Sequence, residues 1–535
     1  MRLRIFGWAR TLRGGKRLHT QLGLPRGLAT APTRSPSSGI TYGVAGVAIG
    51  AAAATLGFYS LNRAERSSTQ PTLKYADKAT MLKAAKEIQA ALGEDSVNTD
   101  GDDLETHGFS EASTSNVDTR PVAIITPSST EDVSLIAKIC TKYEIPMIPF
   151  GAGSSVEGHF SAPYSGFSID FSRMDKILQI NDEDMDVVVQ PGVNWVNLNN
   201  TLKPSGFPTA LIGGMVATNC SGTNAMRYGT MKDYVVNLTV VLADGSVIKT
   251  RRRPRKTSAG YNLNGLFTGS EGTLGIITEV TLKLAIIPTH FGVATTAFPS
   301  VEAATKAATS MIRRGVSLAA LELMDDVQMR VVNQTGGTGG KKWPERPTLF
   351  IKFSGSARAV EDSIKAAKQI STEHAGSSFS AALDEPTMEA LWSARKQALW
   401  AMLAVRPEGT QIWSTDVAVP LSSLAEIVQR SKADASKLGL FSSVLGHVGD
   451  GNFHQSVMYN PDLPEQVEGV QKCVDTMVSR ALEMEGTVSG EHGIGLGKKH
   501  CLAKELGEQT IGVMRTLKRS LDPHWLLNPG KIVDP

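Results

Sequence analysis

Between residues 120 and 284 the chain alternates short apolar runs with glycine-rich turns, and this alternation limits the possible folds more than any other feature of the sequence. The runs at 122–125, 186–189 and 238–242 are rich in valine, isoleucine or leucine, which favours strands. The stretch 130–143 instead shows helical periodicity. This region is therefore expected to mix α-helix and β-sheet.

The rest of the chain provides material for a second folded unit. With 535 residues, of which 41% are hydrophobic, the chain can bury two cores of ordinary size. The Asp-Gly pair at 244–245 lies between two apolar runs and predicts a hairpin, so part of the first sheet is expected to be antiparallel. A junction at 288–298 leads into a segment in which we expect helices at 300–314 and 359–374 and a strand at 348–353.

Residues 1–34 carry eight basic residues, and the first acidic residue of the chain is Glu65. Residues 1–34 are therefore typical of a mitochondrial presequence, with a disordered basic tail as the alternative. Residues 35–62 carry no charge, and the apolar run at 40–61 is, at about 22 residues, long enough to span a bilayer. We expect 35–71 to be a transmembrane anchor and linker, with a buried or flexible segment as the alternative.

Charge and cysteine content exclude several classes of function. Removal of the eight N-terminal basic residues takes the formal net charge from +3 to −5, which does not suggest nucleic-acid binding and would suit a basic electron acceptor. No CxxC spacing indicates a zinc finger or a disulfide framework, because the four cysteines are isolated at Cys140, Cys220, Cys473 and Cys501.

A glycine-rich loop at 149–159 follows a short apolar run at 145–148. Its glycines, Gly151 and Gly153, allow successive backbone N–H groups to converge on an anion such as a diphosphate. The spacing does not match the GxGxxG fingerprint of nicotinamide enzymes, and the chain's other glycine- and lysine-containing stretches do not fit a P-loop. Taken alone, this loop is equally consistent with a tight turn.

Two further glycine-rich segments, 212–229 and 269–278, accompany this loop. Together the three segments resemble the FAD-binding domain of the vanillyl-alcohol-oxidase type, in which two α/β subdomains clasp FAD. The resemblance implies that the first loop binds the diphosphate and that the other two hold the flavin and the ribityl chain. The implied FAD-binding residues are Pro149, Gly151, Ala152, Gly153, Ser154, Ser155, Gly213, Gly214, Asn219, Ser221, Gly222, Arg227, Tyr228, Gly229, Glu271, Gly272, Gly275, Ile276, Ile277 and Asn528. It also implies non-covalent FAD, because His159 is offset from the position at which relatives attach the flavin.

His447 and His454 flank a glycine-rich turn, and Glu491 and His492 follow further along the chain. Two imidazoles and a carboxylate form a three-ligand site with open positions for substrate, as a catalytic Zn²⁺ or Mn²⁺ ion requires. A histidine pair alone is more often a packing feature. Its combination with Glu491, His492 and the flavin loops favours a metal site formed by His447, His454 and Glu491.

This second pattern resembles the FAD-linked oxidase C-terminal domain. The resemblance implies that the three ligands bind a divalent metal, Zn or Mn, that His492 is the catalytic base and that Arg395 binds the substrate carboxylate. An imidazole suits the base because its reference pKa lies close to neutrality. Ser414 and Thr415 offer no second cation, which favours a monocarboxylate substrate.

The function implied by the resemblance is FAD-dependent oxidation of D-lactate to pyruvate, with cytochrome c as electron acceptor. The expected location is the inner mitochondrial membrane, with the catalytic domain facing the intermembrane space. Oxidation of D-2-hydroxyglutarate is the alternative activity. A non-catalytic, membrane-tethered binding protein with a damaged FAD site is the alternative of another class, because the family usually has several more residues between 205 and 211 than this chain.

The expected architecture is α+β with five parts. A presequence (1–34) and an anchor with linker (35–71) precede a two-subdomain FAD-binding domain (72–285). An α/β substrate domain, or cap, with an antiparallel sheet follows (286–510). A C-terminal segment (511–535) is expected to return to the FAD-binding domain.

Overall fold

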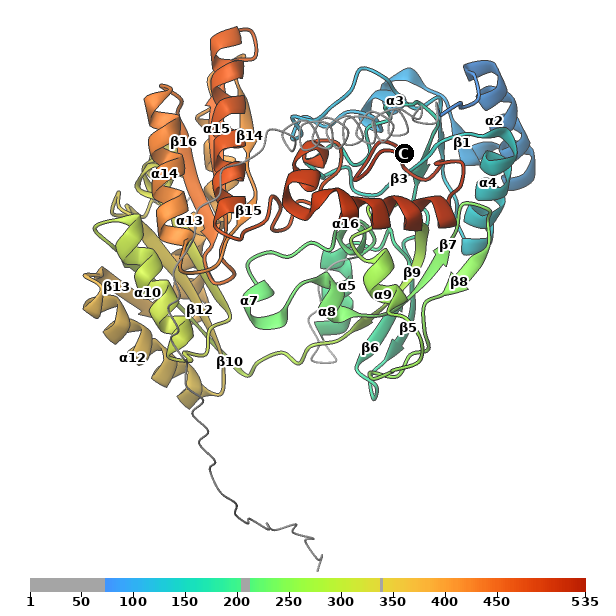
Figure 1. The fold of residues 1–535 in the computed structure, drawn as a ribbon. Helices are drawn as coiled ribbons and strands as arrows, with labels where there is room; N and C mark the ends of the chain where they lie inside the picture. Colours follow the sequence, from blue (N-terminus) through green and yellow to red (C-terminus); the bar gives the residue numbers. More distant parts are fainter. Residues whose placement is uncertain (1–72, 204–211, 337–339) are drawn as a thin grey trace, which may run out of the picture. The chain divides into compact units, whose positions relative to one another are not determined.

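The computed structural model of the chain describes residues 73–203, 212–336 and 340–535 (Figure 1). Pro71–Pro535 form one compact unit. The presequence and anchor expected at 1–71, and the segment 205–211 expected to be shorter than in the family, lie outside the described residues. Among the described residues, no helix combines the length and the apolar character needed to cross a membrane.

The first subdomain of the N-terminal half contains a four-stranded sheet in the order β1-β2-β4-β3. β2, β3 and β4 run parallel, and β1 is antiparallel to β2. The elements are α2 (Lys78–Leu92), η1 (Glu94–Ser96), β1 (Val97–Asn98), α3 (Gly101–Thr106), β2 (Ala123–Ile125), α4 (Thr130–Tyr143), β3 (Met147–Phe150) and β4 (Phe167–Asp170). The helix expected at 130–143 is confirmed. It begins after Ser129, whose side chain accepts a hydrogen bond from the backbone N–H of Asp132.

The second subdomain contains a five-stranded antiparallel sheet in the order β5-β6-β9-β7-β8. Its elements are β5 (Ile177–Asn181), β6 (Asp186–Val189), α5 (Trp195–Leu202), α6 (Gly214–Thr218), α7 (Ala225–Tyr228), α8 (Met231–Tyr234), β7 (Val235–Val241), β8 (Val247–Lys249), α9 (Leu263–Phe267) and β9 (Ile276–Lys283). The predicted hairpin is confirmed, since Val241 pairs with Val247. Gly245 has φ +82°, a conformation that a glycine adopts without strain.

The C-terminal half is built on an eight-stranded antiparallel sheet, as expected. The path is β13-β10-β12-β11-β16-β17-β14, and β15 also pairs with β17. The strands are β10 (His290–Ala297), β11 (Ala320–Met324), β12 (Thr348–Gly355), β13 (Ser377–Ala382), β14 (Gln411–Ser414), β15 (Val417–Ala418), β16 (Ser442–His447) and β17 (Asn452–Tyr459). The strand expected at 348–353 is thus confirmed.

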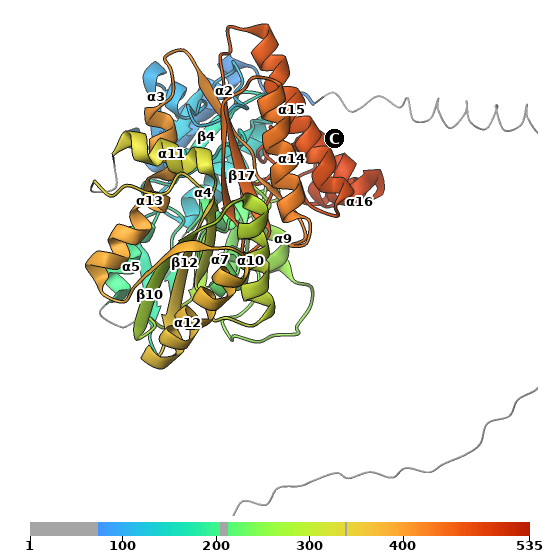
Figure 2. The ribbon, with the colours of Figure 1, turned by 90° about the vertical axis from the view of Figure 1, so that its left-hand side faces the viewer.

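Helices cover both faces of this sheet. They are α10 (Val301–Arg313), α11 (Asp326–Thr335), α12 (Ala357–Glu373), α13 (Glu385–Ala404), α14 (Leu424–Lys437) and α15 (Pro464–Glu483). Alternate residues of β12 face opposite sides, as a strand requires: Leu349 and Ile351 pack in one core with α10, α12 and α14, whereas Phe350 packs in another with α11 and α13. Figure 2 shows α10, α12 and α14 on the same side of the strands. The helices expected at 300–314 and 359–374 are α10 and α12.

The C-terminal residues return to the first subdomain. Helix α16 (Lys499–Leu521) precedes a tail in which Leu527 forms a parallel bridge with Met147 of β3. The backbone N–H of Met147 donates to the carbonyl of Leu526 at 2.7 Å, and that of Asn528 donates to the carbonyl of Met147 at 2.8 Å. The tail therefore lies beside the strand that leads into the first glycine-rich loop.

Candidate active site

A hairpin in the C-terminal half brings the two predicted imidazole ligands together. His447 ends β16 and His454 lies in β17, and the pairing of Leu445 with His454 fixes their register. Their ring centroids are 5.3 Å apart, with the rings nearly perpendicular. Both side chains are buried. The spacing of seven residues thus corresponds to a turn between two paired strands.

Glu491 lies opposite this imidazole pair. Its Oε1 is 3.1 Å from Nε2 of His447 and 3.1 Å from Nε2 of His454. Burial alone would raise the pKa of Glu491, but the two imidazoles hold it well below its usual range. One carboxylate oxygen and two imidazole nitrogens therefore converge on one point, and their ligand atoms lie within 4.8 Å of one another. This is a donor set that a divalent cation accepts.

The other nitrogen of each imidazole is held by the protein. Nδ1 of His447 donates to the carboxylate of Glu322, with both oxygens at 2.9 Å, and Nδ1 of His454 donates to the carbonyl of Thr415 at 2.9 Å. Burial alone would lower the pKa of His447, but the Glu322 and Glu491 carboxylates raise it to about 10. These contacts fix the ring orientations and direct Nε2 of each ring toward Glu491, as in proteins whose metal-bound histidines are oriented by a second hydrogen bond.

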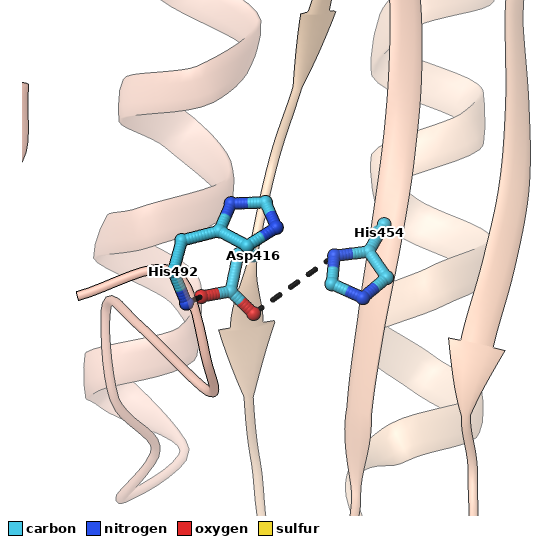
Figure 3. Close-up of side chains that lie close together, drawn as sticks. All are labelled: Asp416, His454 and His492. Atoms are coloured by element: carbon cyan, nitrogen blue, oxygen red, sulfur yellow. Dashed lines mark hydrogen bonds and ion pairs between the residues drawn. The ribbon is translucent and has the colours of Figure 1, made fainter. Parts of the chain in front are cut away.

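Asp416 holds the segment that carries Glu491 and His492. Its Oδ2 accepts hydrogen bonds from the backbone N–H groups of Glu491 at 3.0 Å and His492 at 2.8 Å. Figure 3 shows the carboxylate of Asp416 beside His492 and His454, whose rings stack 5.1 Å apart. Burial alone would raise the pKa of Asp416, but the Lys498 ammonium and the two imidazoles hold it well below its usual range. Since Nζ of Lys498 is 3.3 Å from Oδ2, an ammonium already neutralises this carboxylate.

His492, the predicted base, faces a second carboxylate. Its Nδ1 lies 3.4 Å from Oε1 of Glu157, which is also 3.2 Å from Nζ of Lys498. Glu157 belongs to the first glycine-rich loop of the FAD-binding domain. The His492 side chain is therefore positioned between the cap and the FAD-binding domain.

Arg395, the predicted carboxylate-binding residue, lies on α13 and is paired with Glu322. Its Nη2 and Nε are 2.9 Å and 3.0 Å from Oε2 of Glu322, which also accepts from His447. Lys352 on β12 is a second cation near this group. Its Nζ lies 4.0 Å from the ring centroid of Trp392, and burial, only partly offset by Glu322, lowers its pKa. The expectation that the site has no second cation was based on Ser414 and Thr415, and Lys352 lies on a different strand.

The predicted FAD loops lie next to one another in the FAD-binding domain. The backbone N–H of Glu271 donates to the carbonyl of Ala217 at 2.8 Å, which joins the third loop to the second. A Cβ added to Gly272 would lie 2.9 Å from Pro149, so the third loop also packs against the first. Gly151, Gly214 and Gly222 instead open onto space, because an added Cβ would meet nothing within 4 Å.

The remaining predicted FAD residues occupy several environments. Ile276 and Ile277 are buried in hydrophobic cores, and Gly275 packs against Val240 and Phe267. Arg227 reaches the cap, where its Nη1 donates to the carbonyl of Ser354 at 3.3 Å. The others lie along the three loops, on α6, on α7 or in the C-terminal tail: Ala152, Gly153, Ser154, Ser155, Gly213, Asn219, Ser221, Tyr228, Gly229 and Asn528.

One hydrogen bond joins the two predicted sites. Oγ of Ser221, in the second FAD loop, donates to Oε2 of Glu491 at 3.1 Å. Because Oε1 of the same carboxylate faces both imidazoles, the cap cluster directly borders the loops expected to hold the flavin. The two groups of residues predicted from the sequence are therefore adjacent in the structure.

Comparison with known proteins identifies the family. The family model of the FAD binding domain matches residues 121–251, and that of the FAD linked oxidases, C-terminal domain, matches residues 287–532. The chain is 45% identical to the mitochondrial D-lactate dehydrogenase (cytochrome) of Kluyveromyces lactis over 483 residues, which cover 86% of this chain and 83% of the relative. The chain belongs to the D-lactate dehydrogenase (cytochrome) family.

Another relative agrees with this assignment, and a more distant solved structure shares the fold. The D-lactate dehydrogenase (cytochrome) 1 of Saccharomyces cerevisiae is 43% identical, with 77% of this chain and 72% of the relative covered. The solved structure of 4-ethylphenol oxidase from Gulosibacter chungangensis has a TM-score of 0.72 at 17% identity, covering 85% of this chain and 98% of the other. The likeness to 4-ethylphenol oxidase concerns the fold alone and agrees with the expected α+β FAD-binding architecture.

In this member of the D-lactate dehydrogenase (cytochrome) family, the charged residues around the site that were not predicted from the sequence include Glu322, Lys352 and Asp416, besides Glu157 and Lys498. Glu322 lies in the apolar strand β11, Lys352 in the apolar strand β12, and Asp416 between β14 and β15. For Glu322 and Lys352 the available signal was a charged residue inside an otherwise apolar strand, because such a residue is rarely buried without a partner.

Proposed function

We propose that this chain is an FAD-dependent D-lactate dehydrogenase of mitochondria that oxidises D-lactate to pyruvate and passes electrons to cytochrome c. The family assignment supports this proposal, and relatives at 45% and 43% identity bear that name. The structural observation that carries it is the hydrogen bond between Ser221 and Glu491, which unites the flavin loops and the cap cluster in one site.

The loops have the features of an FAD site. Gly151, Gly214 and Gly222 leave open space beside the backbone, and Oγ of Ser155 and Oδ1 of Asn528 are buried without a hydrogen-bond partner. Backbone N–H groups along such loops bind phosphate oxygens. FAD supplies a two-electron acceptor for the hydride on C2 of the substrate.

The cap cluster fits a divalent cation, which His447, His454 and Glu491 would hold. The fit rests on the donor set, because both Nδ1 atoms are engaged by acceptors while both Nε2 atoms face Glu491. Such a cation polarises a substrate hydroxyl and lowers its pKa. Zinc and manganese both accept two imidazoles and a carboxylate.

The protein's own residues would bind the acid and move its proton. Arg395 has a planar guanidinium that can grip both oxygens of the 1-carboxylate. His492 would take the hydroxyl proton through Nε2, because Nδ1 faces Glu157. Loss of this proton together with the C2 hydride converts D-lactate to pyruvate.

Oxidation of D-2-hydroxyglutarate is the second candidate activity, and Lys352 favours it. Lys352 is half-buried near Glu322 and Arg395 and has an ammonium that a second carboxylate would attract. D-lactate remains the proposed main substrate, since Nζ of Lys352 already contacts the Trp392 ring and is not free to bind a second carboxylate.

The proposed location is mitochondrial, with a presequence at 1–34, an inner-membrane anchor and linker at 35–71, and the catalytic domain facing the intermembrane space. The basic N-terminus and the uncharged apolar run support this arrangement. We also propose domain boundaries at 72–285 for FAD binding, 286–510 for the cap and 511–535 for the returning tail.

Steady-state kinetics with cytochrome c as acceptor test the proposed activity. The purified protein is assayed with D-lactate, L-lactate and D-2-hydroxyglutarate. We expect kcat/KM to be highest for D-lactate. A clear preference for the diacid would replace the main proposal by the second candidate, and purified protein without flavin absorbance would support a non-catalytic binding protein.

A further inference from the structure

Two buried carboxylates, one from each half of the molecule, hold the segment 490–495 around His492. Asp416 of the cap accepts from the backbone N–H groups of Glu491 and His492. Glu271 of the FAD-binding domain accepts from those of Ile494 and Gly495, at 2.7 Å each and through different oxygens. The amide of His492 therefore belongs to the pair held by Asp416, and the pair held by Glu271 begins two residues further along the chain.

We propose that Glu271 is a positioning residue, which places His492 by holding the C-terminal side of this segment from the FAD-binding domain. Placement of the proposed base then depends on contact between the two domains. This inference rests on the proposed function of His492. It assigns the side chain of Glu271 to the cap segment, whereas sequence analysis assigned the residue to FAD.

Glu271 is itself rigidly held. Its backbone N–H donates to the carbonyl of Ala217 at 2.8 Å, and its carbonyl accepts from Nδ2 of Asn528 at 2.8 Å. The same amide nitrogen of Asn528 donates to the carbonyl of His159 at 3.0 Å. The second FAD loop, the third FAD loop and the C-terminal tail thus fix the point from which the Glu271 side chain reaches the cap.

The segment and Glu271 are in direct contact, with no space for an intervening side chain. Gly493 has φ +80°, and a Cβ added to it would lie 2.7 Å from Oε1 of Glu271 and 2.8 Å from Nε2 of His159. Gly493 therefore permits the backbone that follows His492 to approach the carboxylate. This close approach gives a physical reason for glycine immediately after the proposed base.

The charge of Glu271 suits two amide donors. Its side chain is buried, and Nε2 of His159 lies 3.2 Å from Oε2. Burial alone would raise the pKa of Glu271, but His159 and the two amide donors lower it. A glutamine at this position would retain one acceptor oxygen and turn an NH₂ donor toward the other amide. One hydrogen bond would be lost, and the segment would have to shift.

The test compares the wild type with Glu271→Gln and with Glu279→Gln as a matched control. Glu279 lies on β9 of the same domain, and its carboxylate accepts from Oγ1 of Thr239 within the same sheet at 2.7 Å. Each full-length protein is loaded with FAD and assayed for flavin content, for hydrogen exchange of the 488–497 peptide and for anaerobic flavin reduction by D-lactate.

For Glu271→Gln we expect faster exchange in 488–497 and a limiting rate of flavin reduction lower by about 100-fold, because a base displaced by about 1 Å loses roughly that factor. Flavin content and the KM for D-lactate should stay close to wild type, since Arg395 and the imidazole pair lie on other elements. Glu279→Gln should match the wild type in every measurement.

The proposal would be overturned if Glu271→Gln changed neither the hydrogen exchange of the 488–497 peptide nor the limiting rate of flavin reduction. If Glu271→Gln does not retain FAD, Gly493→Ala tests the same contact from the cap side. The proposal would be overturned if Gly493→Ala matched the wild type both in hydrogen exchange of the 488–497 peptide and in the rate of flavin reduction. Absence of reduction by D-lactate in the wild type would instead refute the proposed substrate, while the exchange comparison would still decide whether Glu271 holds the segment.

Discussion

Glu322 joins two residues that sequence analysis assigned to different tasks. Its carboxylate accepts from Nδ1 of His447 at 2.9 Å and pairs with the guanidinium of Arg395 at 2.9 Å. The proposed metal ligand and the proposed substrate-binding arginine therefore share one buried anion. A change at Glu322 is expected to affect metal binding and substrate binding together.

Glu322→Gln should weaken binding of the divalent cation by about 10- to 100-fold, because a neutral amide orients the ring of His447 less firmly than the carboxylate does and can turn its NH₂ group toward Nδ1. The affinity is measured by equilibrium dialysis of Mn²⁺ or Zn²⁺ against the FAD-loaded protein. Glu345→Gln serves as the control, since Glu345 forms an exposed pair with Arg330. Equal metal affinities in the three proteins would contradict the role assigned to Glu322.

His492→Asn should leave FAD and the metal bound but slow flavin reduction by about 10²- to 10⁴-fold, the usual contribution of a general base. The limiting rate is measured by anaerobic stopped-flow absorbance of the flavin. Metal content is determined on the same sample, because Glu491 is the adjacent residue. Wild-type reduction in a metal-replete variant would eliminate His492 as the base.

Arg395→Lys should raise the KM for D-lactate by about 10- to 100-fold, because a lysine ammonium cannot make the two parallel hydrogen bonds of a guanidinium. The limiting rate should change less, since the base and the metal ligands remain. Arg346→Lys is a suitable control outside the site. An unchanged KM would mean that another residue binds the carboxylate.

Lys531 predicts a pH dependence of stability. It is buried, with Nζ hydrogen-bonded to the carbonyl of Ser161, and burial lowers its pKa from 10.5 to about 7. At Lys531 the unfolded chain therefore binds more protons than the folded protein between pH 7 and pH 10, so the contribution of this residue to stability rises with pH in this window.

Relative to Lys531→Met, the free energy of unfolding of the wild type should increase by about 2 kcal/mol between pH 7 and pH 9. The measurement is urea unfolding of both flavin-free proteins at several pH values. The methionine side chain does not titrate, so it removes this contribution while retaining similar volume. A difference that stays constant across this range would show that Lys531 keeps an ordinary pKa.

Much of the fold and part of the site could be predicted because the relevant signals are local. The helix at 130–143, the hairpin at 244–245 and the turn between His447 and His454 each depend on residues adjacent in the sequence. The family resemblance then connected the glycine-rich loops with the cap. Neither source of information required knowledge of contacts between distant residues.

The partners of the supporting residues could not be predicted, because they lie far away in the chain. Glu322 is separated by 125 residues from His447 and by 73 from Arg395. Its own surroundings, Ala320–Met324, have the composition of an ordinary buried strand. Asp416 likewise acquires its role from amides 75 and 76 residues away, and Glu271 from amides more than 200 residues away.

In the proposed mechanism, the cap cluster and the flavin loops form one site that removes hydride from C2 of D-lactate. Single-turnover reduction of the enzyme-bound flavin by D-lactate, compared with D-lactate deuterated at C2, tests it most directly. We expect complete loss of the oxidised-flavin absorbance, at a limiting rate that is slower for the deuterated acid. Flavin that remains oxidised in the metal-replete protein at saturating D-lactate would contradict it.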